Sequence, residues 1–362
     1  MSKRLLGGLM LGAGVLAQAA GCGSHDQADG VSSGGVSSGG ASSGGTNSGG
    51  SGGPAPNGGS SGGLAGGASG GTAAGDVETG FAARYPGDIG IENEHSLIFA
   101  DDFESYGDAS ELWDRWDNTY QEDQTRIAIE PGNVFFGEQS LEFTLPASSE
   151  ELSNAVQKVL TDELDVLYLR WYAKFDADND IVGSSHNGGG ISAHYFVGDQ
   201  ATPGIPADGT NKFLMEFEHW RGDATTAAPG ELNVYIYHPE QRDDYGDHFF
   251  PSGKVLPNTS IPFDFGDSFE SRPDLVPELE RWYCYEVMVR ANTVGERDGQ
   301  VTLWLDGVRV GDFGNLRLRD VDTLKIDRFN LSFHARETPS STKRFYDNVV
   351  AATAYIGPMA QP

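Results

Sequence analysis

Polar and aromatic side chains with the chemistry to handle a sugar recur at every second position of four strand-like segments. They are Arg170, Tyr172 and Lys174; Ser192 and His194; Asn233, Tyr235 and Tyr237; and Asn330, Ser332 and His334. Alternate residues of a β-strand point to the same side, so each set would share one face. Aromatic rings stack on sugar rings and polar tips bond hydroxyls, so four agreeing strands predict a groove for a sugar polymer. A solvated outer sheet face is the alternative.

The segments that carry these residues have the two-residue period of half-buried strands. The strands expected are 126–129, 140–145, 155–159, 166–175, 190–197, 212–220, 232–238, 283–291, 300–306, 328–334 and 345–356. Asp306-Gly307 predicts a hairpin turn between 300–306 and the residues up to Val310. Many short strands with no amphipathic helix of twelve or more residues indicate an all-β fold, an antiparallel sandwich or jelly roll. We see no boundary that would divide residues 90–358.

One connection, from Pro239 to Arg281, is unusually long for a compact domain. It has little periodicity but contains several aromatic residues, among them Tyr245, Phe250 and Phe263. Long ordered loops are usually functional, so we expect a flap over the groove. A disordered insertion is the alternative, and the aromatic content argues against it.

The N-terminal 22 residues resemble an export signal. Lys3-Arg4 precedes an apolar stretch that is too short to span a bilayer, and Ala19-Ala20-Gly21-Cys22 resembles the lipobox of bacterial lipoproteins. The resemblance implies lipidation of Cys22 and a membrane anchor, and an ordinary signal peptide is the alternative. Residues 23–76 follow as a predicted disordered Gly/Ser linker, because 30–75 has no charged or aromatic residue. Residues 77–362 then form the expected folded domain.

Charge and cysteine content exclude two classes of protein. The net charge is −29, and the charged residues before Asp76 cancel, so the folded part carries all of it. A nucleic-acid-binding protein needs a basic face, which argues against that class. Cys22 and Cys284 are the two cysteines, so this is not a disulfide scaffold. Cys284 lies in a strand-like run and is expected to be a buried thiol.

Glu216 and Glu218 share one face of the segment 212–220 and invite comparison with retaining glucanases. The third carboxylate that such a motif requires is missing. A glycoside hydrolase needs its acid and its nucleophile or base on opposite sides of the scissile bond. This function therefore ranks below the others.

Several motifs in matching order make residues 165–356 resemble polysaccharide lyase family 14. They are 167–175, the Gly-rich 188–194, 234–239 with Gln241 and 245–246, 282–286, 292–295, 298–307 and 347–349. The resemblance implies a β-jelly roll of the concanavalin A-like type that cleaves alginate or glucuronan-type uronates by β-elimination. The related glucuronan-lyase-like jelly rolls, which include a fungal cellulose-induced protein, are also similar.

The resemblance assigns roles to individual residues. The family's serine and basic residue two apart match Ser192 and His194, with His in place of the usual Arg, and its Tyr-x-Tyr strand matches Tyr235 and Tyr237. The family's catalytic lysine has no match. His186 is the only titratable side chain in the corresponding segment 182–188 and would replace it.

β-Elimination on a uronate needs a group that stabilises charge on the C5 carboxylate, a base for the C5 proton and an acid for the leaving oxygen. Arg170 or His194 would face the carboxylate. Tyr235 or Tyr237 would be base and acid, and His186 is a further candidate base. The expected substrate-binding residues are Ser192, Tyr172, Lys174, Glu218, Asn233 and His334. The net charge opposes a polyanion at long range, so a locally basic groove or a bound cation would have to offset it.

A structural Ca²⁺ is also expected. First and last strands of such sandwiches often pair, which would bring Glu104 near Asp347. Two carboxylates with oxygens from the turn that ends at Ser140 would make an oxygen-rich calcium site. The related jelly rolls carry calcium at such a position. Ordinary acidic surface residues are the alternative.

The sequence thus predicts an exported, lipid-anchored jelly roll that acts on an extracellular polysaccharide, with no organic cofactor and no nucleic-acid partner. Polysaccharide lyase is the first function. A non-catalytic carbohydrate-binding or adhesion protein is the second, and a glycoside hydrolase is the third.

Overall fold

The computed structural model describes residues 77–183, 185–241, 243–249 and 275–361. Cys22, the linker 23–76 and the central part of the long connection, 250–274, lie outside the described residues. The predictions for lipidation, for linker disorder and for most of the flap therefore stay predictions. Within the described residues, no helix is long and apolar enough to cross a membrane.

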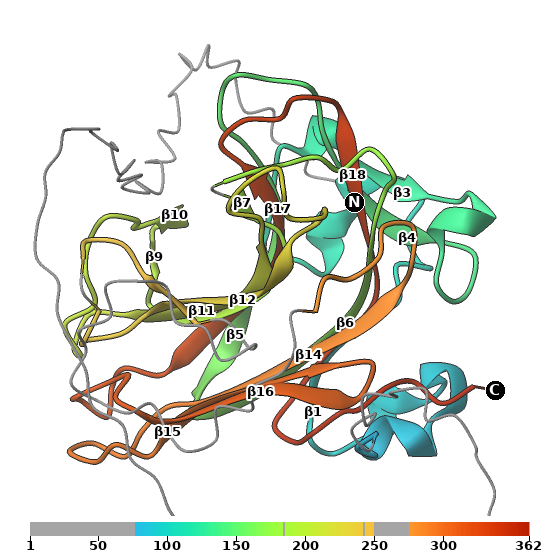
Figure 1. Ribbon diagram of the computed structural model, residues 1–362. Helices are drawn as coiled ribbons and strands as arrows, with labels where there is room; N and C mark the ends of the chain where they lie inside the picture. The colour runs from blue at the N-terminus through green and yellow to red at the C-terminus, as the bar shows by residue number, and fades with distance from the viewer. Residues whose placement is uncertain (1–76, 184, 242, 250–274, 362) are drawn as a thin grey trace, which may run out of the picture. The chain divides into compact units, whose positions relative to one another are not determined.

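Two antiparallel sheets of eight strands each build the molecule (Figure 1). Sheet A has the order β16-β15-β14-β6-β18-β4-β3, with β1 paired to β18. Sheet B has the order β13-β12-β11-β8-β17-β5-β2, with β7 paired to β17. A separate hairpin pairs β9 with β10. The all-β sandwich expected from the sequence is confirmed.

The strands of sheet A are β1 (Leu97–Asp101), β3 (Thr125–Ala128), β4 (Ser140–Leu145), β6 (Val166–Phe175), β14 (Tyr283–Arg290), β15 (Gly299–Leu305), β16 (Val308–Leu316) and β18 (Thr342–Ala352). Those of sheet B are β2 (Asn118–Tyr120), β5 (Leu152–Leu164), β7 (Ser185–His186), β8 (Gly189–Ala193), β11 (Phe213–Trp220), β12 (Glu231–Tyr237), β13 (Asp247–Phe249) and β17 (Ile326–Ala335). The hairpin consists of β9 (Phe196–Val197) and β10 (Gln200–Ala201). Short 3₁₀ turns occur at η1 (Phe81–Arg84), η2 (Pro86–Asp88), η3 (Ile91–Asn93), η4 (Ala109–Asp114), η5 (Glu122–Gln124) and η6 (Pro131–Asn133).

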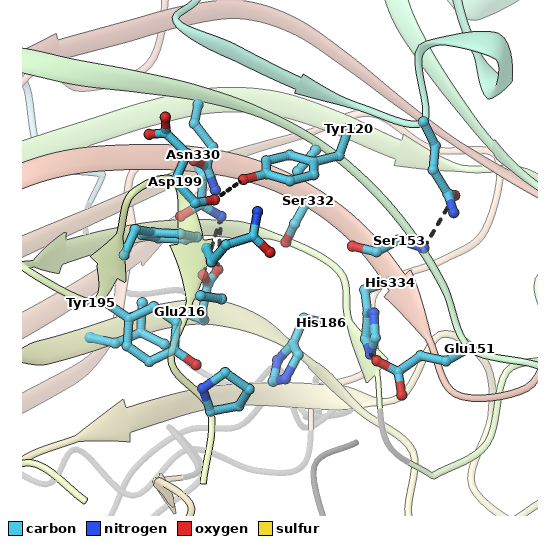
Figure 2. A pocket seen from close by; sticks show the side chains of 18 of the residues that line it. Tyr120, Glu151, Ser153, His186, Tyr195, Asp199, Glu216, Asn330, Ser332 and His334 are labelled. Atoms are coloured by element: carbon cyan, nitrogen blue, oxygen red, sulfur yellow. Dashed lines mark hydrogen bonds and ion pairs between the residues drawn. The ribbon is translucent and has the colours of Figure 1, made fainter. Parts of the chain in front are cut away.

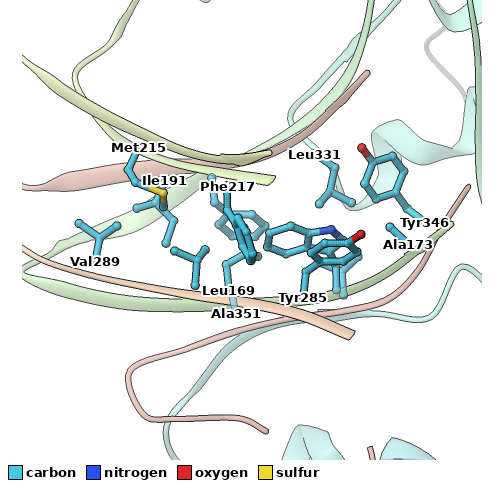
Figure 3. Packing of buried hydrophobic residues seen from close by; sticks show 14 of the residues in the cluster. Leu169, Ala173, Ile191, Met215, Phe217, Tyr285, Val289, Leu331, Tyr346 and Ala351 are labelled. Atoms are coloured by element: carbon cyan, nitrogen blue, oxygen red, sulfur yellow. The ribbon is translucent and has the colours of Figure 1, made fainter. Parts of the chain in front are cut away.

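The inner faces of the two sheets form one hydrophobic core (Figure 3). Trp171 of β6 stacks on Tyr285 of β14, with ring centroids 5.6 Å apart, and meets Phe217 of β11 edge-on across the sandwich at 6.1 Å. The alternation read from the sequence explains this packing, because every second side chain of each strand turns inward. The side chains between them turn outward, and on sheet B they form a polar floor.

The Gly-rich run before β8 is required by this packing. A Cβ on Gly189 would lie 2.8 Å from the Trp171 ring, and a Cβ on Gly190 would lie 2.3 Å from the Glu216 carboxyl on the opposite face. Side chains at these positions would displace either the core or the floor of sheet B.

The expected strand 190–197 is wrong in its second half. Strand β8 ends at Ala193, and His194 has a left-handed backbone with φ 50°. The chain then turns into the β9–β10 hairpin. The Asp306-Gly307 turn is confirmed: both residues have positive φ, 52° and 76°, between the paired strands β15 and β16.

Candidate functional site

A cavity of about 310 Å³ lies on the outer, polar face of sheet B (Figure 2). Its lining residues come from strands, loops and the β9–β10 hairpin. They are Tyr120, Gln121, Glu151, Leu152, Ser153, Ala155, Gln157, His186, Tyr195, Phe196, Asp199, Gln200, Ala201, Pro203, Leu214, Glu216, Tyr235, Asn330, Ser332 and His334. This volume is at the lower end of small-ligand sites, which span roughly 300–1,000 Å³.

The floor of the cavity is a straight row across five strands. Tyr235 of β12 pairs with Glu216 of β11, which pairs with Gly190 of β8. Gly190 pairs with Asn330 of β17, and Asn330 pairs with Gln157 of β5. Because cross-strand partners point to the same face, strands that are far apart in sequence present a phenol, a carboxyl and two amides side by side. Gly190 leaves room in the middle of the row.

Glu216 is a buried carboxyl on this floor. Only 7 % of the residue is exposed, and burial raises its pKa to about 8, with a smaller contribution from the neighbouring Glu218. Asn330 Nδ2 donates to Glu216 Oε1 at 3.1 Å. Glu216 is therefore largely protonated at neutral pH and carries an O–H that can be donated to a ligand.

Two further polar atoms of the floor have no hydrogen-bond partner among the described residues, namely Asn330 Oδ1 and Ser332 Oγ. Both residues line the cavity and are more than nine-tenths buried. A buried polar atom without a partner is costly, and a polar ligand would satisfy both atoms.

His186 and Glu218 form an oriented pair beside Glu216. His186 Nδ1 lies 2.8 Å from Glu218 Oε2, and Asn233 Nδ2 donates to Glu218 Oε1 at 2.8 Å. Glu218 is fully buried; burial raises its pKa, while His186 and, less strongly, Arg344 of the core oppose that rise. Where Nδ1–H donates to Glu218, the neutral imidazole has its lone pair on Nε2.

The rings around His186 are packed closely. Its centroid lies 4.8 Å from that of Tyr235 and 5.4 Å from that of His334. Burial and, to a smaller extent, the neighbouring His186 lower the pKa of His334 to about 3, so His334 is neutral at pH 7. The Nε2 atom of His334 lies 3.8 Å from Oε1 of Glu151 at the rim.

Tyr235 and Tyr237 differ in position although they share a face of β12. Tyr235 lines the cavity, whereas Tyr237 is fully buried behind it. The Tyr235 hydroxyl donates to that of Tyr237 at 3.4 Å, and Tyr237 also accepts the backbone N–H of Gly204 at 3.2 Å. Tyr237 therefore holds a loop next to the cavity.

The face predicted for Ser192, Asn233 and the β17 residues is confirmed as one face of sheet B, but only part of it reaches the cavity. Ser192 is fully buried, its Oγ has no hydrogen-bond partner among the described residues, and it does not line the cavity. Asn233 supports Glu218 from behind. Ser332 and His334 line the cavity directly.

His194 does not join this group. The left-handed turn at its Cα breaks the two-residue alternation, and its Nε2 lies 2.9 Å from Glu163 Oε1 outside the cavity lining. The expected shared face of Ser192 and His194 is therefore wrong.

Arg170, Tyr172 and Lys174 lie on β6 in sheet A, so the expectation that they share the groove is wrong. Arg170 is fully buried and forms an ion pair with Asp88 of η2. The Tyr172 hydroxyl accepts the N–H of Met359 at 2.8 Å, and Lys174 Nζ donates to the carbonyl of Gly132 at 2.7 Å. The polar side chains of β6 therefore bind the segments near the two ends of the described chain and the loop that contains Gly132. Sequence alternation does not reveal which sheet a strand joins.

The expected pairing of the first and last strands is confirmed, since β1 pairs with β18. Glu104 raises the pKa of the buried Asp347, although burial is the larger cause, so the two carboxyls lie near each other. Backbone N–H groups of Phe135 and Phe136 donate to Asp347, and Ser140 Oγ donates to the carbonyl of Asn133. The described residues contain no cluster of three or more His, Cys, Asp or Glu side chains that could hold a metal ion.

A cation is nevertheless compatible with these residues. Two neighbouring carboxyls repel each other when both are ionised, and the buried Asn348 Oδ1 has no hydrogen-bond partner among the described residues. Hard oxygen ligands of this kind suit Ca²⁺. Ser140 does not fit as a side-chain ligand because its hydroxyl is directed to Asn133.

Several lining residues were not among the predicted site residues, above all Glu216, Gln157, Tyr120, Glu151 and Tyr195. Glu216 had a usable signal, because two carboxylates on one face of an otherwise apolar strand are seldom buried without a role. Gln157 and Tyr120 had none, since only the register of β5 and β2 brings them to the floor.

No protein-family model matches the chain, and no curated protein matches it. Among solved structures, alginate lyase Aly36B has a TM-score of 0.52 at 18 % identity, covering 72 % of this chain and 98 % of that one. A variant of that enzyme in complex with an alginate tetrasaccharide gives 0.51 at 18 % identity, with the same coverage. An endo-β-1,4-glucuronan lyase from the fungus Trichoderma reesei gives 0.45 at 16 %, covering 71 % of this chain and 95 % of that one. The chain therefore has the β-jelly-roll fold of the alginate lyase structures.

Proposed function

We propose that the protein is a polysaccharide lyase that cleaves a uronic-acid-containing polymer by β-elimination in the cavity of sheet B. The observation that carries the proposal is the grouping of Tyr235, His186 and the protonated Glu216 around one small cavity. These groups can supply the base, the acid and the charge stabilisation that the reaction requires.

The uronate carboxylate is bound without arginine or lysine. The described lining residues include neither, and they include the acidic residues Glu151, Asp199 and Glu216. The O–H of Glu216 and the amide of Gln157 donate to the carboxylate, and His186 adds a positive charge beside it only once it has taken the C5 proton. As C5 loses its proton, negative charge builds on this carboxylate, and donors already in place stabilise it.

Proton transfer then involves two neighbouring rings. His186 Nε2 takes the C5 proton, because Glu218 holds the other ring nitrogen in its N–H form. The C5–H electrons form the C4–C5 double bond, the C4–O4 bond breaks, and the O4 oxygen takes a proton from the Tyr235 hydroxyl. The ring centroids of His186 and Tyr235 lie 4.8 Å apart, close enough for both to contact one sugar unit.

The test is a panel of alginate, glucuronan and neutral glucans incubated with the protein. A lyase yields an unsaturated product that absorbs in the ultraviolet. New reducing ends without this absorbance would identify a hydrolase. In that case Glu216 would be the candidate acid, and Glu151 at the rim the candidate nucleophile or base. Binding without any product would identify a carbohydrate-binding protein and would contradict the lyase proposal.

Export and anchoring are separate proposals based on the lipobox-like sequence before Cys22. Replacing Cys22 with Ser should change a membrane-associated protein into an unprocessed or soluble one, measured by cell fractionation. Equal membrane association of the wild type and the variant would rule out the lipid anchor.

We also propose that Glu104 and Asp347 hold a structural Ca²⁺. A chelator should then lower the melting temperature, and added Ca²⁺ should restore it, because a cation that binds only the folded state stabilises it. The Glu104→Gln variant should be insensitive to both treatments. A wild type whose melting temperature ignores chelator would contradict the proposal.

A further inference from the structure

The β9–β10 hairpin reaches across the polar floor of sheet B. It belongs to the excursion 194–212 between β8 and β11, and it turns at Gly198 and Asp199, both with positive φ. This is the backbone geometry of a tight two-residue hairpin. Figure 1 shows β9 and β10 standing away from the sheet, on the side of β11 and β12.

The tip of the hairpin is tied to the far edge of the sheet. Asp199 Oδ1 accepts hydrogen bonds from Asn118 Nδ2 and Arg328 Nη2, both at 3.2 Å. The carbonyl of Asp199 accepts the hydroxyl of Tyr120. Asn118 and Tyr120 belong to β2, the edge strand, and β17 and β5 separate β2 from β8. The hairpin therefore spans these two strands.

The base of the hairpin is equally well held. The Gly204 N–H donates to Tyr237, and Thr202 Oγ1 donates to the Tyr195 carbonyl at 2.7 Å. Lys212 Nζ donates to Thr202 Oγ1 at 2.9 Å and lies 4.6 Å from the centre of the Tyr237 ring. With contacts at both ends, the hairpin is a fixed wall.

This wall runs beside the floor row, because its base is held at Tyr237 of β12 and its tip at Asn118 of β2, the strands at the two ends of that row. From the wall the cavity extends along β17, where Asn330, Ser332 and His334 line it in turn. Six of the cavity-lining residues belong to the hairpin and its base: Tyr195, Phe196, Asp199, Gln200, Ala201 and Pro203. Figure 2 shows Asp199 and Tyr120 joined above the cavity, with Glu216 and His186 below them.

We propose that the β9–β10 hairpin, latched to β2 through Asp199, blocks one end of the cavity, so that the protein acts on the end of a polysaccharide chain. The inference rests on the proposed function and adds its mode of action. A polymer that lies in the direction of β17 meets the hairpin, so its terminal unit occupies the cavity and the rest of the chain extends the opposite way, past His334.

The experiment uses the full chain and the glycan that the panel identifies, supplied as a polymer and as sized oligomers. Chain-end cleavage releases a small unsaturated product from the first time point, while viscosity falls only in proportion to product. Opening the latch with Asp199→Ala, or by deleting 197–200, should raise the viscosity loss per product formed several-fold. As a control, Asp178→Ala removes another exposed carboxylate, from the loop after β6, and should change neither the viscosity loss nor the product yield.

Rapid loss of viscosity with intermediate-sized fragments in the wild type would overturn the latch proposal and leave the lyase proposal standing. If the protein binds a glycan without cleaving it, calorimetry decides. One protein per chain at every chain length supports end recognition, whereas a stoichiometry that rises with chain length contradicts it. If no glycan is cleaved or bound, both proposals fail.

Discussion

Sheets A and B carry similar alternating patterns of polar and aromatic residues, but they use them differently. On sheet A the outer face is covered by the segments before β1 and after β18, where Phe81, Ile91 and Ile356 pack on Val350. On sheet B the outer face forms the floor of a cavity among the described residues. Polar side chains in the same alternating pattern therefore make structural contacts where the terminal segments pack on them, and line a cavity on sheet B.

The two outer faces also differ in how fully their buried polar groups are hydrogen-bonded. In sheet A, the buried Arg170 is bonded to Asp88 and to the Asn348 carbonyl, and Glu286 accepts the N–H groups of Ile356 and Gly357. In sheet B, Asn330 and Ser332 keep buried oxygens without partners among the described residues. Buried polar groups are normally satisfied, so sheet B is the face that a polar ligand would complete.

The largest expected effect lies in sheet A. Replacing Arg170 with Met removes one partner of a buried ion pair and leaves Asp88 uncompensated, which should cost about 3–5 kcal/mol of unfolding free energy. Denaturant unfolding measures this, and adding Asp88→Asn should recover part of the loss. Turnover per folded molecule should not change. A stable Arg170→Met protein that lacks turnover would contradict this structural role and would show that Arg170 acts in the reaction.

The next effect separates two residues of one strand. Tyr235→Phe removes the proton donor in the cavity and should lower turnover roughly 10²-fold or more with the fold intact. Tyr237→Phe, the matched control, removes a hydroxyl that holds Gly204, and should cost only about 1 kcal/mol of stability. Both are measured by product absorbance and by thermal unfolding. Equal loss of turnover in the two variants would contradict the distinction between them.

The third effect concerns the pH dependence of stability and is gradual, because it is spread over several pH units. The pKa of Glu216 is raised to about 8, so its protonated form favours folding; that stability is complete below the unfolded pKa and is lost as pH rises through the folded value. Between pH 4.5 and 8 the wild type should lose up to about 1.4 kcal/mol per pH unit relative to Glu216→Gln. Thermal unfolding across this range measures the difference. Parallel profiles would show that Glu216 is ionised in the fold.

The sequence by itself determined the fold class and most strands. The expected 140–145 and 166–175 agree with β4 and β6, because alternation and flanking turn residues are local signals. It also placed Tyr235, His186 and His334 among the candidates that line the cavity. It misplaced His194, because one left-handed residue reverses the alternation and no local signal marked it.

Only the tertiary structure decided which polar faces meet. Arg170 and Tyr235 have equivalent patterns in sequence, yet β6 joins sheet A and β12 joins sheet B. Strand order and register depend on contacts between residues far apart in the chain, as in the row that joins Glu216 to Asn330 and Gln157. Burial of Glu216, and with it its protonation, follows from that register. The sequence determines each strand's chemistry, and the packing of the sheets determines where that chemistry acts.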